Sequence, residues 1–317
     1  VAADITLGGK TTVPVQMLYD IVRKLPDDAE ITFKQAGDQL VVSSGRAVFR
    51  LPTLPAENFP AMAGSNLTTK FQMTTGDLAH LINQTKFAIP TDDVRYHLGG
   101  IYFHISDEGK EKMLTAVATD AQRMALCAMP APAGSVEMPA VILPRRVIGE
   151  LSKLLEDATV DDVTVELSDT KARFTVGAAI LTSKLVDAQY PNYRVVIPKG
   201  NDKIAILDRK QFLNAVDLVS VASVDKTKSV QLTYSMNKLV VNASSPDAGT
   251  ATQELDIEYN GDASFTVTFN VKFLMDVAGQ VEGEKFQMEM QDPLSPTIIK
   301  STDKNTDALF ILMPMRM

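Results

Sequence analysis

Apolar and polar residues alternate along many short segments of this chain, and other segments space their apolar residues three and four positions apart. Alternation over 162–168 (DVTVELS), 238–244 (KLVVNAS) and 265–270 (FTVTFN) predicts strands with one buried face. A looser helical spacing, as at Leu78, Leu81, Ile82 and Phe87, predicts short amphipathic helices over 15–25, 76–87, 145–155, 208–220 and 271–281. Thr75 or Asp77, and Asp208, are the candidate N-caps of two of them.

The predicted elements recur in one order, which indicates internal repeats. Residues 11–60 and 140–191 each give a strand, a proline, a helix, an acidic turn, three strands and an aromatic-proline pair. Pro14 recurs as Pro144, and Phe59-Pro60 recurs as Tyr190-Pro191. A third copy of this unit begins near residue 267, with Asn270 at the proline position.

A second type of half-unit lies between these copies. Residues 70–89 and 203–222 both give a strand, a cap and a helix, with Leu78 matching Phe212. Each half-unit is expected to contain one helix and about four strands, and two half-units make a domain of about 130 residues.

We therefore expect half of a first domain at 1–68 and complete domains at 69–199 and 200–317. By this spacing the first domain lacks its N-terminal half, so we expect the chain to be truncated there. A protein built naturally from two and a half domains is the alternative.

Composition is that of a globular protein, with 45% hydrophobic and 22% charged residues among 317. The net charge of −8 argues against a surface that is basic all over, although a local basic face remains compatible with it. No apolar run approaches the roughly 18 residues of a membrane helix, and the first residues do not read as a signal peptide. Cys127 is the single cysteine, which excludes a disulfide framework. Together these features favour the cytoplasm.

Motifs for catalysis or metal binding are missing from the sequence. His80, His97 and His104 share no ligand spacing, and no zinc-protease, hydrolase-elbow or P-loop pattern occurs. The segment TLGGKTT (6–12) lacks the leading glycine of a phosphate-binding loop and precedes a strand. His104, on an alternating strand, is more typical of a structural residue. We expect no enzymatic activity, cofactor or metal.

Four segments together resemble one family: VRYHLGGIYF (94–103), AVATDAQRMALCAMP (116–130), FTVGAAILTSKLVDAQYPNYRVVIPK (174–199) and the terminal ILMPMRM. The chain resembles the bacterial beta sliding clamps of DNA polymerase III over essentially its whole length. The resemblance implies an α+β fold of tandem clamp-type domains that form a ring, with two helices of each domain lining the inside and antiparallel sheets outside. It implies a head-to-tail homodimeric ring that encircles duplex DNA and tethers the replicative polymerase.

A ring of this kind needs basic residues on its lining, which the helices would form. Acids lie mostly in turns and strands, as at Asp27-Asp28 and Asp161-Asp162. Contact with phosphates through such cations is independent of base sequence and weakened by salt. For any single cation a solvated helix face is the simpler interpretation. The helix cations are Arg23, Lys24, Lys86, Arg145, Arg146, Lys153, Arg209, Lys210 and Lys272, and the resemblance adds the loop of Arg95, Tyr96 and His97, where the family often has a second aromatic in place of the histidine.

The chain ends on methionines and a proline, which are apolar, adaptable and unable to extend a sheet. Closure of the last domain would explain such a tail. The resemblance implies instead that it forms one wall of a pocket for short Gln- and Leu-rich motifs of polymerases, the clamp loader, and repair and mismatch-repair proteins. The pocket residues implied are Leu98, Thr119, Ala121, Gln122, Arg123, Met124, Pro191, Val195, Val196, Asn270, Phe273, Ile311, Met313, Pro314, Met315, Arg316 and Met317.

Two departures from the family concern the rim of this pocket. The family often has Gly-His where this chain has Ala121-Gln122, and an arginine where it has Val195. We expect the apolar sub-pocket to be retained with altered polar contacts at its rim.

The resemblance also implies a subunit interface between the first and third domains. We expect an apolar centre flanked by pairs of arginines and carboxylates, which would fix register more than strength. Because side chains alternate along a strand, Glu254, Asp256 and Glu258 would lie on one face of it. The interface residues are Arg46, Phe49, Arg50 and Leu51 on one side, and Val221, Ala222, Glu254, Asp256 and Glu258 on the other.

Two other classes of protein were weighed against a clamp. An enzyme or small-ligand module on tandem β-rich repeats predicts a polar pocket with a strongly shifted ionisable group. A purely structural scaffold predicts no apolar groove near the C-terminus. The order of the half-units and the missing catalytic motifs favour the clamp.

Overall fold

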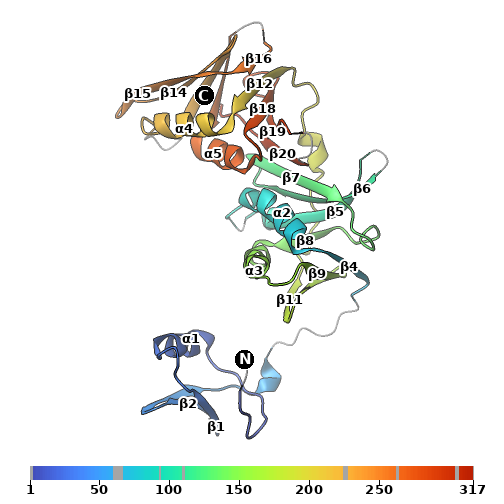
Figure 1. Cartoon of the computed structure of the whole chain (residues 1–317), viewed down its shortest axis with the longest axis vertical. Helices are drawn as coiled ribbons and strands as arrows, with labels where there is room; N and C mark the ends of the chain where they lie inside the picture. Colours follow the sequence, from blue (N-terminus) through green and yellow to red (C-terminus); the bar gives the residue numbers. More distant parts are fainter. Residues whose placement is uncertain are drawn as a thin grey trace. The chain divides into compact units, whose positions relative to one another are not determined.

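The chain divides into two units, 1–64 and 65–317, and each is described by itself (Figure 1). The computed structural model describes residues 3–59, 67–92, 94–108, 111–223, 228–261, 264–303 and 307–316. No helix among them is long and apolar enough to cross a membrane.

Unit 1 contains one helix and one antiparallel sheet of three strands in the order β1-β2-β3. Its core consists of Leu40, Val42 and Leu51 from the sheet, covered by half-buried residues that include Leu18 and Ile21 of the helix. The elements are α1 (Val15–Lys24), β1 (Thr32–Ala36), β2 (Gln39–Ser44), β3 (Ala47–Pro52) and a short 3-10 helix, η1 (Ala56–Asn58).

The strand expected before Pro14 is absent, and this prediction was wrong. Residues 11–14 pair with no strand of the described chain. The Thr12 hydroxyl instead donates to the Leu54 carbonyl and accepts from the Leu54 amide, both at 2.9 Å. Helix α1 buries none of its residues, because it covers only this small sheet.

Unit 2 contains two complete copies of a repeated domain. The first copy has β4 (Thr69–Thr74), α2 (Thr75–Thr85), η2 (Lys86–Ala88), η3 (Tyr96–Leu98), β5 (Gly100–Glu108), β6 (Glu111–Thr119), β7 (Arg123–Pro130), β8 (Val141–Pro144), α3 (Arg145–Glu156), β9 (Asp162–Leu167), β10 (Lys171–Val176) and β11 (Ala179–Lys184). After η4 (Tyr193–Val196), the second has β12 (Lys203–Asp208), α4 (Arg209–Ser220), β13 (Ser229–Ser235), β14 (Lys238–Ser245), β15 (Gly249–Asp256), β16 (Glu258–Tyr259), β17 (Phe265–Asn270), α5 (Val271–Gln280), β18 (Lys285–Met290), β19 (Thr297–Ser301) and β20 (Ala308–Leu312).

The strand before each helix of unit 2 pairs with the sheet of the other half of its domain. β4 pairs with β9 and β8 with β5, and in the second copy β12 pairs with β18 and β17 with β13. This exchange ties the two halves of a domain together and sets α2 beside α3 and α4 beside α5. It also gives the physical reason for the missing strand in unit 1, where the described residues contain no second half-sheet for residues 11–14.

A nine-stranded sheet runs through both domains in the order β16-β12-β18-β19-β20-β7-β6-β5-β8. The two domains join at an antiparallel ladder between β20 and β7, from Ala308 opposite Cys127 to Leu312 opposite Arg123. Pairing satisfies the backbone groups that an open edge would leave to solvent. The ladder makes the C-terminal strand part of the joint between domains.

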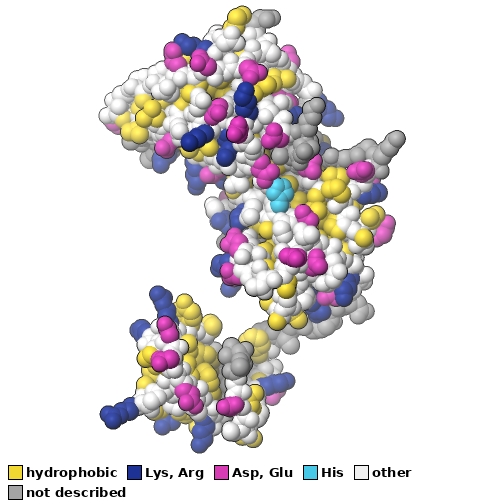
Figure 2. All heavy atoms as spheres, viewed as in Figure 1, with side chains coloured by type: hydrophobic (Ala, Val, Ile, Leu, Met, Phe, Trp, Pro, Cys, Tyr) yellow, Lys and Arg dark blue, Asp and Glu magenta, His cyan; other side chains and the backbone are white. Residues whose placement is uncertain are grey.

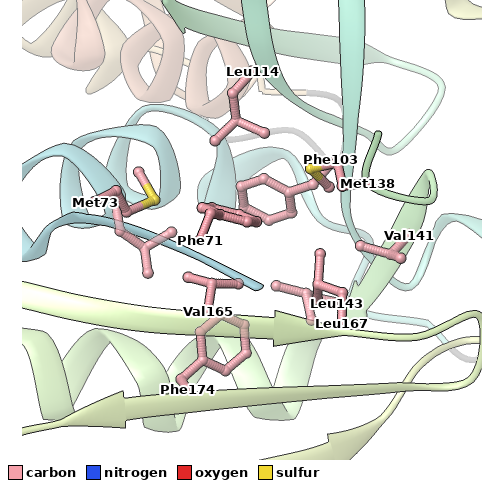
Figure 3. Close-up of a pocket in the computed structure, with 11 residues that line it drawn as sticks. Phe71, Met73, Phe103, Leu114, Met138, Val141, Leu143, Val165, Leu167 and Phe174 are labelled. Atoms are coloured by element: carbon pink, nitrogen blue, oxygen red, sulfur yellow. The ribbon is translucent and has the colours of Figure 1, made fainter. Parts of the chain in front are cut away.

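The core of the first complete domain lies between its two sheets and its helices (Figure 3). Phe71, Leu114, Val165 and Phe174 are among the apolar side chains that converge there. They leave a void of about 20 Å³ that no polar side chain lines. A void of this size and lining is a packing defect rather than a ligand site.

The predicted helices, the predicted strands of unit 2 and one of the two predicted caps agree with the structure. All five predicted helices are present within two residues of their expected bounds, and each half-unit of unit 2 supplies four strands or more. Asp208 caps α4 by accepting from the Gln211 amide at 2.8 Å, as predicted. The prediction for α2 was wrong, because Thr74 is its cap and accepts from the Asp77 amide at 3.0 Å. Thr75 instead donates to the carbonyls of 160 and 161.

Candidate functional site

The C-terminal tail is fixed to both domains of unit 2. Beyond β20, the Met313 amide donates to the Gln122 carbonyl of the first complete domain at 2.8 Å. The Met315 amide donates to the Thr268 carbonyl on β17 at the same distance. Pro314 between them is buried, Met313 and Met315 are half-buried, and Arg316 is exposed. Met317 lies outside the described residues.

A separate apolar cluster lies beside this tail. Its buried members come from η3, β6, β7, β8, β20 and η4, so segments far apart in the sequence meet there. Leu98, Met124 and Ile311 were predicted pocket residues and are part of it. The other buried members are Val117, Ile142, Tyr190 and Tyr193.

Two exposed valines lie on η4, the short turn that begins with buried Tyr193. Val195 has 76% of its surface exposed and Val196 has 50%. Pro191, just before the turn, is exposed as well. Exposed apolar side chains beside a buried apolar cluster are typical of binding surfaces rather than of domain interiors.

Four of the predicted pocket residues, Thr119, Ala121, Gln122 and Arg123, lie on a tight turn at 119–123. The Thr119 hydroxyl donates to the Arg123 carbonyl at 2.7 Å, and the Asp120 carboxylate accepts from the amides of Gln122 and Arg123. Ala121 has a φ of 71°, a left-handed conformation that costs a residue with a Cβ about 1–2 kcal/mol. Ala121 and Gln122 are exposed, so the turn offers its tip to solvent.

Arg123 is part of this turn, and its side chain is buried between the two domains of unit 2. Its side chain is only 8% exposed and forms ion pairs with Asp120 and, from α5, Asp276. It donates to the Phe87 carbonyl at 2.9 Å, and its guanidinium lies 5.2 Å from the Phe87 ring and 4.6 Å from the Phe273 ring. Arg123 and Phe273 therefore join the two domains, and the pocket role of Arg123 stays a prediction.

Asn270, also predicted for the pocket, is the N-cap of α5. Its side-chain oxygen accepts from the Phe273 amide at 3.2 Å. The cap lies two residues beyond Thr268, the residue that anchors Met315. Asn270 thus fixes the start of the helix that carries Phe273 and Asp276.

Most helix cations of unit 2 are exposed, on the side of the unit where α2 to α5 lie (Figures 1 and 2). Lys86, Arg146, Lys210 and Lys272 make no ion pair with any described residue. Lys153 has only an exposed pair with Glu150 at 3.4 Å. In unit 1, Arg23 and Lys24 are exposed at the end of α1.

Three other predicted DNA-facing cations make bonds within the chain. Arg145 donates to the Pro90 carbonyl at 3.0 Å, and half-buried Arg209 donates to the Gly283 carbonyl at 3.2 Å. Arg95 pairs with Asp92 at 2.7 Å and so holds the pKa of that carboxyl below its usual range. These bonds fix the guanidinium groups in place. Tyr96 is exposed and His97 half-buried on the same loop.

The prediction that acids lie mostly in turns and strands is confirmed, because only six of the 39 acids lie on the five helices. Every one of the five helices carries at least one acid: Asp20, Asp77, Glu150, Glu156, Asp217 and Asp276. Asp276 forms an ion pair with Arg123, and the other helix acids make the helix faces mixed in charge. Figure 2 accordingly shows acidic and basic side chains interspersed.

The predicted interface residues lie on or next to edge strands of their sheets, except Val221 and Ala222, which directly follow α4. β3 is an edge of the sheet in unit 1, and β15 is an edge of the sheet β15-β14-β13-β17 in unit 2. On β3, Phe49 is half-buried, Leu51 lies in the core, and Arg50 is exposed, as is Arg46 just before the strand. Leu51 therefore does not contribute to the exposed surface of this edge, whereas Arg50 does.

On the other side, Val221 has 75% of its surface exposed and Ala222 is buried. Glu254 and Asp256 share the exposed face of β15, as alternation predicted. Glu258 does not continue that face, because β15 ends at Asp256 and Glu258 begins β16 in another sheet. Glu254 pairs with Lys238, and Glu258 pairs with Lys285 at 3.1 Å.

The contacts among the aromatic residues around Tyr190 and Tyr193 were not predicted from the sequence. Tyr102 stacks on Tyr190 with ring centroids 4.6 Å apart, and His104 lies 2.9 Å from the Tyr193 hydroxyl. The alternation of Tyr102 and His104 along β5 was the available signal, since it places both rings on one face. No sequence pattern indicated that these two side chains contact Tyr190 and Tyr193.

Tandem domains, each with a helix pair and two sheets, joined through one continuous sheet, define the class of DNA clamps. Models of the DNA polymerase III beta subunit match the chain in three parts: the N-terminal domain at 1–63, the central domain at 72–192 and the C-terminal domain at 194–316.

Comparison with curated proteins and solved structures agrees. The beta sliding clamp of Caulobacter vibrioides is 42% identical over 316 residues, which cover 99% of this chain and 84% of the relative. The beta sliding clamp of Escherichia coli K12 is 36% identical over 98% of this chain and 82% of its own. The structure of a Bartonella birtlesii DnaN sliding clamp bound to griselimycin superposes with a TM-score of 0.93, at 40% identity over 100% of this chain and 84% of that one. This chain belongs to the beta sliding clamp family, and its function is that of a DNA sliding clamp.

Proposed function

We propose that two copies of the chain close head to tail into a ring around duplex DNA and tether the replicative polymerase to it. The exposed cations of α2 to α5 support this proposal, because they would meet phosphates without reading bases. Their mixture with acids favours weak and mobile contacts, which sliding requires. Arg95, Tyr96 and His97 would add a loop contact to the DNA.

The subunit interface would extend one sheet into another. β3 and β15 are edge strands, and edges pair readily with a second chain. Since Leu51 and Ala222 are buried in their own domains, the apolar centre reduces to Phe49 and Val221. Arg46 and Arg50 would face Asp256 and Glu254, with Glu258 further off on β16. Reversing both arginines to glutamate should open the ring at lower salt than wild type, and an unchanged dimer would contradict this interface.

Partner proteins would bind the groove formed by the apolar cluster, the turn at 119–123, η4 and the tail. The observation that carries this proposal is the tail itself, which continues from Ile311 of the apolar cluster and keeps Met313 and Met315 half-buried. Methionine side chains adapt to varied ligands. We infer that short Gln- and Leu-rich motifs of the polymerase, the clamp loader, and repair and mismatch-repair proteins bind here.

The same proposal makes the chain a non-catalytic subunit that acts on the nucleoid in the cytoplasm. Its support is membership of the beta sliding clamp family. An enzyme on tandem repeats is not favoured. His104, whose pKa is lowered by burial, lies among aromatic rings rather than open to a substrate.

The test is the binding of a fluorescent Gln-Leu-rich polymerase tail peptide, measured by anisotropy. We expect the affinity to fall at least tenfold when Met315–Met317 are removed. Met236→Ala is the matched control, because Met236 is an exposed methionine in the turn between β13 and β14, away from the groove. Equal affinity of wild type and the shortened chain would contradict the assignment. Griselimycin, which is bound in the Bartonella birtlesii clamp, is a second probe and should compete with the peptide.

A further inference from the structure

His104 is a buried polar residue that lies directly behind the proposed groove. It is 6% exposed, on β5, which lies between β6 and the edge strand β8 of the nine-stranded sheet. Its Nε2 lies 2.9 Å from the Tyr193 hydroxyl, and its Nδ1 lies 3.0 Å from the Ile105 carbonyl oxygen. Tyr193 is the first residue of η4, the turn with the exposed Val195 and Val196.

The two contacts define the protonation state of the ring. A carbonyl oxygen only accepts, so Nδ1 carries the proton and donates to Ile105. Nε2 is then the acceptor, and the Tyr193 hydroxyl donates to it. Burial lowers the pKa of His104, and the nearby Arg194 guanidinium lowers it further, which keeps the ring neutral at neutral pH. A protonated ring could no longer accept from Tyr193.

Aromatic stacking also connects His104 to Tyr190, the residue just before Pro191. Tyr102, two residues before His104 on β5, stacks on both His104 (4.8 Å) and Tyr190 (4.6 Å). Tyr190 and Tyr193 are the residues that flank the exposed segment of Pro191. β5 thus contacts this segment at both of its ends, by stacking at Tyr190 and by a hydrogen bond at Tyr193.

We propose that His104 is a positioning residue for the partner-peptide groove: by accepting from the Tyr193 hydroxyl it fixes η4, and with it the placement of Pro191, Val195 and Val196. This inference rests on the proposed function of the groove. His104 does not touch the peptide. It acts through Tyr193, which is itself packed in the apolar cluster.

The test is a double-mutant cycle on peptide affinity, with His104→Leu, Tyr193→Phe and the double variant. His104→Leu removes the acceptor and leaves the buried hydroxyl without this partner, so we expect peptide binding to weaken roughly 3- to 10-fold. Tyr193→Phe should weaken it to a similar or smaller extent. The double variant should recover most of the affinity, because replacing both partners by apolar groups is nearly neutral. His104→Gln keeps an acceptor and should bind close to wild type.

Two controls separate positioning from general destabilisation. Tyr234→Phe removes a buried hydroxyl in the other domain, where it contacts Met288, and should lower stability without changing peptide affinity. The ¹⁵N spectrum of the His104 ring should show the Nδ1–H form in wild type and in the peptide complex. A ring protonated at Nε2 would overturn the proposed bond.

The measurements distinguish a wrong role for His104 from a wrong assignment of the peptide-binding groove. If wild type binds the peptide and removal of Met315–Met317 abolishes binding, but His104→Leu and the cycle show no effect, His104 is not a positioning residue. Additive losses in the cycle would overturn it equally. If wild type itself does not bind the peptide, the proposed function fails first.

Discussion

Arg123→Ala tests the joint between the two domains of unit 2. The substitution removes the partner of Asp120 and Asp276, a donor to the Phe87 carbonyl, and the cation that lies over two aromatic rings. Loss of one member of a buried pair costs about 3–5 kcal/mol, because the other charge is left unpaired. Asp120 is 12% exposed but Asp276 is 35% exposed and can regain water, so the lower end applies. We expect a loss of about 3 kcal/mol.

Urea denaturation followed by circular dichroism measures this loss, and thermal unfolding should shift by about 6–12 °C for a unit of this size. Arg173→Ala is the matched control. Arg173 pairs with Glu166 at 3.8 Å and is 41% exposed, so its removal should cost less than about 0.5 kcal/mol. If the two variants lose the same stability, the joint does not depend on Arg123 and the reasoning from burial is wrong.

Three further predictions concern single residues. Ala121→Gly should stabilise the chain by about 0.5–1 kcal/mol in urea, because relief of the left-handed strain exceeds the added freedom of the unfolded chain; destabilisation would refute this. Thr74→Ala should cost about 1 kcal/mol by removing the cap of α2, while Thr74→Ser should keep the stability of wild type. Burial lowers the pKa of His104, so the unfolded state binds more protons and stability should fall as the pH drops through about 6.5. His104→Gln should flatten that part of the pH profile, and an identical profile would exclude His104 as its source.

Much of the fold could be predicted because its signals are local. The five helices were predicted from apolar residues three and four positions apart, and Asp208 was predicted as a cap from its position just before a helix. The repeat of Pro14 at Pro144 gave the order of the half-units. At Thr74, Thr75 and Asp77, however, three polar residues compete for one cap within a few positions, and only the backbone geometry decides between them.

Contacts between distant residues could not be predicted. Arg123 and Asp276 are 153 residues apart, and His104 and Tyr193 are 89 apart. Because sequence spacing does not reveal such pairs, the ion pair between Arg123 and Asp276 was not predicted, and His104 was interpreted only as a structural residue. The ladder between β7 and β20 is equally long-range. Likewise, alternation grouped Glu258 with Glu254 because nothing local marks the break between β15 and β16.

The central claim, a ring that holds DNA by topology, is tested most directly on a nicked circular plasmid. The labelled chain is loaded with a bacterial clamp loader and ATP, and gel filtration separates bound from free protein before and after one restriction cut. The account predicts that protein elutes with the circle and is released when the circle is linearised. Equal retention on circular and linear DNA would contradict it.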